Sequence, residues 1–171
     1  PGGVDVFDRA GGERERIERP EIFYALGVDV DADGTIYVVN RAPSPWDYDR
    51  PGPHPTPPPA LAAPAQDAPG VVEGIVILDP AHAVREVVPF VTPEDVAVGP
   101  IGAFVSRNVE IFALRETAPL YSGPPGGLAV GFVDGIVLHL DVTAQGRLLG
   151  GMAHCYFQGV VRFDDPSARP A

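Results

Sequence analysis

Short apolar segments alternate with turn-forming residues along most of the chain. After residue 70, segments such as VVEGIVILDP, AVREVVPFV and VEIFALRE are rich in Val, Ile and Phe, with Gly, Pro, Asp or Asn between them. Strands that recur at intervals of roughly ten residues are typical of an all-β barrel or sandwich. Beyond a single turn near TPEDVAV, no long segment carries the period of an amphipathic helix. We therefore expect an all-β fold.

The clearest local prediction is a β-hairpin within residues 21–40. Here ADG separates LGVDV from TIYVVN, and an Asp-Gly turn between β-branched and aromatic residues favours a hairpin. The same DADG letters begin like a calcium loop. They lack the ligand at the fifth position and the Glu at the twelfth that an EF-hand needs, so the hairpin interpretation is preferred.

Residues 42–70 differ in composition from the rest of the chain. They contain ten prolines, which remove backbone donors and exclude both a helix and an interior strand. We predict a long Pro-rich surface insertion over residues 43–69 of a single-domain β-barrel or distorted jelly roll spanning residues 21–163. Residues 1–20, with the charged run DRAGGERERIER, are expected to be an N-terminal arm, and residues 164–171 a C-terminal tail.

The charge of the chain narrows the classes of ligand. The formal net charge is −11, and all twelve basic residues are Arg. Nucleic-acid binding needs clustered cations, so we expect no nucleic-acid partner. No apolar run approaches the ~20 residues of a membrane span, and no signal-peptide core precedes residue 20, so we expect a soluble, cytoplasmic protein. One Cys and four His residues without metal-ligand spacing predict neither a disulfide nor a metal site.

Several motifs follow one another in an order that resembles the dUTPase and dCTP-deaminase family. They are ALGVDV, then ILDPAHAVREVVPFVTPEDVAVGPIGAFVSRN, ETAPLYSG and GFVDGIVLHLDVTAQGRLLGGMAHCYF. The resemblance covers residues 21–161. It implies a β-barrel that is largely trimeric, with sites between subunits, and activity with Mg²⁺ on a deoxynucleoside triphosphate. A nucleotide hydrolase or deaminase is therefore the first functional hypothesis.

The departures from that family fall on its chemistry. Its phosphate-binding Arg-Ser-Ser motif is represented by VSRN, which leaves Ser106 and Arg107, with Arg115 nearby, as candidate substrate-binding residues. Arginine suits phosphate oxygens, although two exposed arginines near a turn are the simpler interpretation. The family's Asp-containing turn has no Asp in TAPLYSGPPGGLAVGF. The resemblance therefore also fits a member that has lost its activity.

His139 stands where the deaminases of this family carry their general-base Glu. An imidazole can act as a base near neutral pH, which makes His139 the candidate catalytic residue. On its predicted strand it shares a face with Asp141, opposite the apolar face of Leu140. A hydrogen-bonded surface histidine is the alternative. Asp29 and Asp31 also share a face of their strand; in the family comparison Asp29 has a structural position, and solvated carboxylates beside a turn explain the pair more simply.

A second resemblance leads to a different function. GVDVDADGTIYVVN and TPEDVAVGPIGAFVSRNVEIFA, with a shorter third copy in PPGGLAVGFVDGIVLHL, resemble NHL-type β-propeller repeats. Propellers need about four or more sheets to close, and this length supplies roughly three, so the barrel is the preferred expectation. The alternative function is a non-enzymatic assembly or protein-interaction module. The Pro-rich segment is either its contact with a protein partner or a tolerated insertion.

Overall fold

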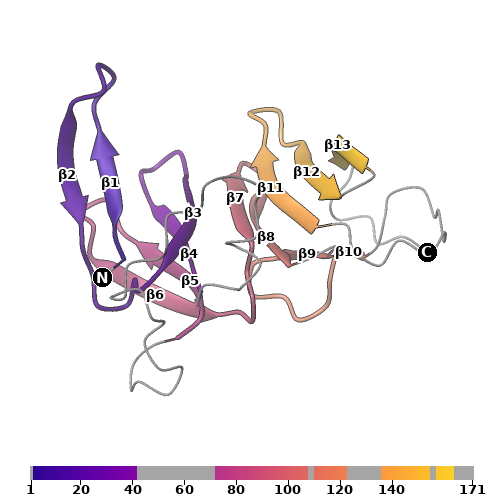
Figure 1. Cartoon of the computed structure of the whole chain (residues 1–171), viewed down its shortest axis with the longest axis horizontal. Coiled ribbons are helices and arrows are strands. Elements are labelled where there is room, and N and C mark those ends of the chain that lie inside the picture. The colour runs from indigo at the N-terminus through magenta and orange to yellow at the C-terminus, as the bar shows by residue number, and fades with distance from the viewer. Residues whose placement is uncertain (1, 42–71, 108–109, 123–135, 155–156, 164–171) are drawn as a thin grey trace, which may run out of the picture.

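The fold is all-β, as the sequence predicts. The structure is a computed structural model, and it describes residues 2–41, 72–107, 110–122, 136–154 and 157–163. Within these residues lie thirteen strands in four antiparallel sheets (Figure 1). None of the sheets closes into a barrel in the described part of the chain.

Three of the sheets are meanders in which each strand pairs with its neighbour in sequence. Sheet I contains β3 (Ala25–Val30), β4 (Ile36–Asn40), β5 (Gly74–Leu78) and β6 (Val84–Pro89). Sheet II contains β7 (Asp95–Gly99), β8 (Gly102–Arg107), β9 (Glu110–Ala113) and β10 (Tyr121–Ser122). Sheet III contains β11 (Ile136–Val142), β12 (Leu148–His154) and β13 (Phe157–Phe163). The fourth sheet is the hairpin of β1 (Val4–Phe7) and β2 (Glu13–Ile17).

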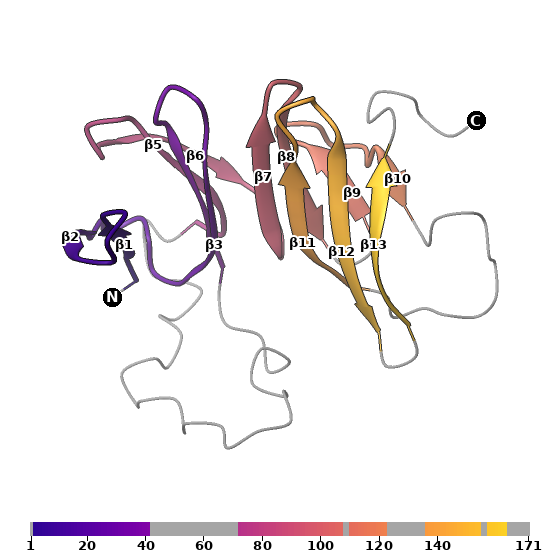
Figure 2. The ribbon, with the colours of Figure 1, turned by 90° about the horizontal axis from the view of Figure 1, so that it is seen from above.

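The three meanders stack one after another instead of joining edge to edge. Figure 2 shows them following one another along the length of the molecule. Their first strands lie together, since β3 contacts β7 and β7 contacts β11. The expected barrel or jelly roll is corrected here: strand pairing stops between β6 and β7 and again between β10 and β11. Apolar faces are covered by the next sheet, so closure is not needed to bury them.

Two apolar clusters hold the stack together. Between sheets I and II lies a cluster of buried aliphatic side chains: Val39, Ile75, Ile77, Val88, Val96 and Val105. Between sheets II and III lies a second one: Ala97, Phe104, Ile111, Leu140, Val142 and Leu148. Sheet I is also covered on its other face, which explains why β5, with the sequence GIVIL, is buried along its whole length. Burial on both faces requires a continuous apolar run in place of the alternation of a half-exposed strand.

One turn is used four times to connect strands. Its first residue accepts a backbone hydrogen bond from the fourth residue and donates one to the fifth; the turns begin at Asp8, Asp31, Asp79 and Thr143. The fourth residue always has a positive φ, in Gly11, Gly34, His82 and Gly146. In all four turns the side-chain oxygen of the first residue also accepts from the N–H of the fifth. The hairpin predicted around ADG is the second of these turns and is confirmed.

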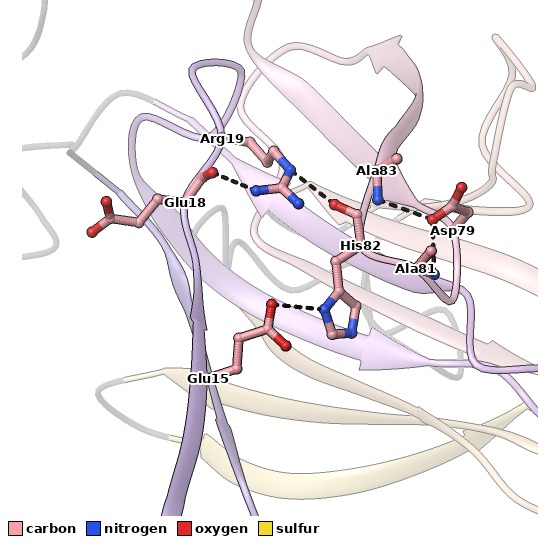
Figure 3. Close-up of polar contacts among 7 residues, drawn as sticks. All are labelled: Glu15, Glu18, Arg19, Asp79, Ala81, His82 and Ala83. Atoms are coloured by element: carbon pink, nitrogen blue, oxygen red, sulfur yellow. Dashed lines mark hydrogen bonds and ion pairs between the residues drawn. The ribbon is translucent and has the colours of Figure 1, made fainter.

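Residues 1–20, which the sequence presents as an arm, contain the hairpin β1–β2. Ile17 at the end of β2 is fully buried against sheet I. Polar contacts attach the hairpin to the turn between β5 and β6 (Figure 3): Arg19 Nε donates to the His82 carbonyl oxygen at 2.8 Å, and His82 Nδ1 lies 3.1 Å from Glu15 Oε1. The charged run is therefore the exposed side of a strand whose last residue enters the core.

The Pro-rich segment lies outside the described residues, but its two ends belong to neighbouring strands. Asn40, the last residue of β4, is opposite Gly74, the first residue of β5. The buried Asn40 side chain donates to the carbonyl oxygens of Glu21 and Val72. The end of β4 and the start of β5 are therefore held together by strand pairing and by the Asn40 side chain. Among the described residues, no helix is long and apolar enough to cross a membrane.

Candidate functional site

The first strands of the three sheets bring together carboxylates that are far apart in sequence. Asp29 lies on β3, Asp95 on β7, and His139 and Asp141 on β11. Asp29 and Asp95 each reach across to the next sheet. Because β7 contacts both β3 and β11, polar side chains of sheets I and III both approach sheet II along β7.

Asp29 joins sheet I to sheet II. Its Oδ2 accepts the backbone N–H of Val98 on β7 at 2.6 Å, and its Oδ1 accepts the N–H of Val30 on its own strand at 2.8 Å. A carboxylate that accepts two backbone N–H groups is a strong acceptor. Asp29 therefore has a structural role between sheets, in agreement with the structural position that the family comparison gave it.

Asp95 joins sheet II to sheet III in the same manner. Its Oδ2 accepts the N–H of Leu140 on β11 at 2.8 Å. Burial raises the pKa of Asp95 above its usual value, while hydrogen bonds from the N–H groups of Leu140 and Val96 act in the opposite direction. Asp95 also touches sheet I, since a Cβ at Gly27 would lie only 2.6 Å from its Oδ1. Gly27 thus leaves the space that this carboxylate occupies.

Asp31, the second carboxylate of the pair noted in the sequence, serves its own turn. Its Oδ1 accepts the N–H groups of Asp33 and Thr35 at 3.2 and 2.9 Å. It is therefore separate in function from Asp29, which faces sheet II.

His139, the candidate catalytic residue, lies on the open side of β11. Its side chain is 80% exposed, and its Nδ1 is 3.8 Å from Asp95 Oδ2. This separation is too long for a hydrogen bond, so Asp95 does not orient the imidazole as the acid of a catalytic dyad does. The facing predicted from the sequence is confirmed for the described side chains: His139 and Asp141 are exposed, and Leu140 is buried.

The three candidate phosphate-binding residues have separate surroundings. Ser106 is fully buried on β8, and no partner of its hydroxyl is found among the described residues. The Arg107 guanidinium donates twice to Glu110 Oε2 and lies 4.7 Å from the centre of the Phe112 ring. Arg115, in the connection after β9, pairs with Glu86 on β6. Both guanidinium groups are thus engaged by glutamates, each on a different part of the surface.

The described residues hold no group of three or more His, Cys, Asp or Glu side chains placed to bind a metal ion. Asp95 is a residue of this region that was not predicted from the sequence. The sequence carries no local signal for its role, because its partner Leu140 is 45 residues away. A scan of the sequence against protein-family models finds no matching family, and a search of curated proteins finds no matching relative.

Proposed function

We propose that this chain is a non-enzymatic binding module whose sheets are arranged like those of a β-propeller. The observation that carries the proposal is that the first strands follow one another in a stack of meanders, with β7 in contact with both β3 and β11. In a propeller, four-stranded meanders are placed radially with their first strands at the centre. The arrangement fits the NHL-type resemblance of GVDVDADGTIYVVN and TPEDVAVGPIGAFVSRN.

The contacts of the polar side chains support a structural role over a catalytic one. Asp29 and Asp95 connect sheets through backbone N–H groups. Arg107 and Arg115 are paired with Glu110 and Glu86. A phosphate would have to displace a carboxylate from each arginine, against the net charge of −11. The three stacked sheets of the described residues are also fewer than the four to eight, roughly, of a closed propeller.

The proposed function is tested against the alternative that the chain is a nucleotide hydrolase or deaminase. The purified chain is incubated with dUTP or dCTP and Mg²⁺, while pyrophosphate release, deamination and the melting temperature are followed. The proposal expects no turnover and no stabilisation by either nucleotide. Turnover that disappears in His139→Ala, or in Arg107→Ala, would contradict it and would restore the enzyme of the dUTPase and dCTP-deaminase type.

The same preparation tests the assembly predictions. Sedimentation of the chain measures whether it forms the trimer that the family resemblance implies. A variant without residues 43–69 measures whether the Pro-rich segment contributes to binding of a protein partner. Both stay predictions, and neither decides whether the module is enzymatic.

A further inference from the structure

The turn between β3 and β4 contains an Asp-Gly pair, Asp33–Gly34. In such a pair the backbone nitrogen of the glycine can attack the side-chain carboxyl carbon of the aspartate, because glycine has no side chain to hinder a close approach. A bond forms between nitrogen and Cγ, while the nitrogen's proton and the hydroxyl of the protonated carboxyl leave as water. Water then opens the five-membered succinimide at either carbonyl carbon, which returns aspartate or yields isoaspartate.

Hydrogen bonds in this turn engage both reacting groups. The N–H of Gly34 donates to the carbonyl oxygen of Asp31 at 3.1 Å. Asp33 Oδ1 accepts the hydroxyl of Thr35 at 2.8 Å and the N–H of Thr35 at 3.2 Å. For the attack to occur, the nitrogen has to leave the first of these bonds and the carboxyl has to leave the other two. The folded turn therefore opposes the reaction.

The Thr35 hydroxyl is the strongest restraint on the Asp33 carboxyl. Its hydrogen bond is the shorter of the two, and the Thr35 N–H is shared with Asp31 Oδ1 at 2.9 Å. Thr35 is 3% exposed, so water is a poor substitute for this partner. Hydrogen bonds to a carboxylate also favour its ionised form, which has no hydroxyl to lose as water.

The reactive pair and its restraint occur in the same copy of the turn that is used four times. In this copy the third residue is Asp33, which places a carboxyl directly before the glycine, and the fifth is Thr35. The other three copies have Ala10, Ala81 and Gln145 in third place and Gly12, Ala83 and Arg147 in fifth place. Since those turns form without a hydroxyl in fifth place, the Thr35 hydroxyl is not needed to make the turn.

We propose that Asp33 is a site of isoaspartate formation and that the Thr35 hydroxyl controls how fast it forms. Isoaspartate carries the main chain through Cβ and Cγ, so it adds one atom to the backbone of the turn. The added atom disturbs the register of β3 against β4, and with it the position of Asp29, which bonds to Val98 of sheet II. The inference is independent of the proposed function.

The test follows isoaspartate at Asp33 during incubation at neutral pH and physiological temperature. Proteolytic mapping with electron-transfer fragmentation identifies it separately from any at Asp134–Gly135, the second Asp-Gly pair of the sequence. The whole folded protein is compared with a free peptide of residues 29–38, in which the turn is not held. We expect isoaspartate to form at least roughly tenfold more slowly in the folded protein.

Variants of the whole protein separate the hydroxyl from overall stability. Thr35→Val keeps the branched shape without the hydroxyl and should raise the rate roughly tenfold, the effect of losing a hydrogen bond to a charged group. Thr35→Ser keeps the hydroxyl and should retain the unmodified rate. Val88→Ala removes volume from the cluster between sheets I and II, outside the turn, and should also retain that rate although it lowers stability. Circular dichroism verifies that each variant is folded.

Three results would overturn the proposal. The first is isoaspartate formation at Asp33 that is as fast in the folded protein as in the free peptide, or that is undetectable in both. The second is a Thr35→Val variant with the unmodified rate, which would show that the hydroxyl does not restrain the carboxyl. The third is an equal increase in Thr35→Val and in Val88→Ala or Thr35→Ser, which would assign the rate to general loosening of the protein.

Discussion

At the scale of single residues, the carboxylates of Asp29 and Asp95 have the same role: Asp29 connects sheet I to sheet II, and Asp95 connects sheet II to sheet III. Each lies on the first strand of a sheet and accepts a backbone N–H from the first strand of the next. Asp29 was recognisable as structural from its motif. Asp95 was not, because its partner Leu140 is 45 residues away and its space depends on a glycine, Gly27, in another sheet. Sequence spacing does not encode a contact among three sheets.

The raised pKa of Asp95 predicts how stability changes with pH. Because burial raises the folded-state pKa above the unfolded value, the folded protein holds this proton more tightly. The stabilising contribution is complete below the unfolded pKa and is lost as the pH rises through the folded pKa. Between pH 7 and pH 4, unmodified protein should therefore gain stability relative to Asp95→Asn, whose amide oxygen can still accept the Leu140 N–H.

Urea unfolding of both proteins across this pH range measures the difference. The comparison with Asp95→Asn cancels the other carboxylates of the chain. If the difference in unfolding free energy between the two proteins does not change with pH, or grows as the pH rises, burial does not control the protonation of Asp95.

At the scale of elements, the turn that connects strands four times explains which hairpins could be predicted from the sequence. An Asp followed three residues later by Gly marks the turns at Asp8 and Asp31. At Asp79 the same turn has His82 in the left-handed position, with φ 64°, so the glycine signal is absent. The hairpin at residues 31–35 was predicted, whereas residues 79–83 were noted only within the ILDPAHAVREVVPFV segment that resembles the dUTPase and dCTP-deaminase family.

The left-handed position of His82 gives a prediction for this turn. His82→Ala and His82→Gly both remove the contact with Glu15, but only glycine adopts a positive φ without steric cost. The glycine variant should therefore be more stable than the alanine variant by about 1 kcal/mol. Thermal or urea unfolding measures the difference.

Ala81→Gly is the matched control within the same turn. Ala81 does not have a positive φ, so a glycine there should lower stability by roughly 0.5–1 kcal/mol. A His82→Gly variant that is no more stable than His82→Ala would contradict the left-handed conformation.

At the scale of the whole molecule, the all-β class was predicted correctly from the sequence. The predicted closure of the strands into a barrel was wrong, because the described strands form separate stacked sheets. Val- and Ile-rich segments between turn residues indicate strands, yet they do not specify whether a strand pairs with its neighbour or begins a new sheet. That choice is made at the connections after β6 and β10, where stacking of sheets I, II and III buries both apolar faces. Residues 136–140 of the shorter third copy lie in β11, Ile136–Val142, and its residues 124–135 lie outside the described part of the chain.

The whole-molecule account also predicts the effect of shortening the chain between β4 and β5. Asn40 and Gly74 are opposite each other, and Asn40 Nδ2 donates to the Val72 carbonyl oxygen at 3.2 Å. Replacing residues 43–69 with a short Gly-Ser turn should therefore leave the strand spectrum in circular dichroism unchanged and the midpoint of unfolding within a few degrees. Loss of the cooperative transition would show that those residues are part of the core.

The measurement that tests the central claim most directly is amide hydrogen exchange at Val98 and Leu140. The account predicts that both amides are protected, that Asp29→Ala removes protection from Val98 and leaves Leu140 protected, and that Asp95→Ala does the reverse. If both amides exchange freely in the unmodified protein, or if their protection does not respond to these substitutions, the first strands are not joined across the sheets by aspartate side chains.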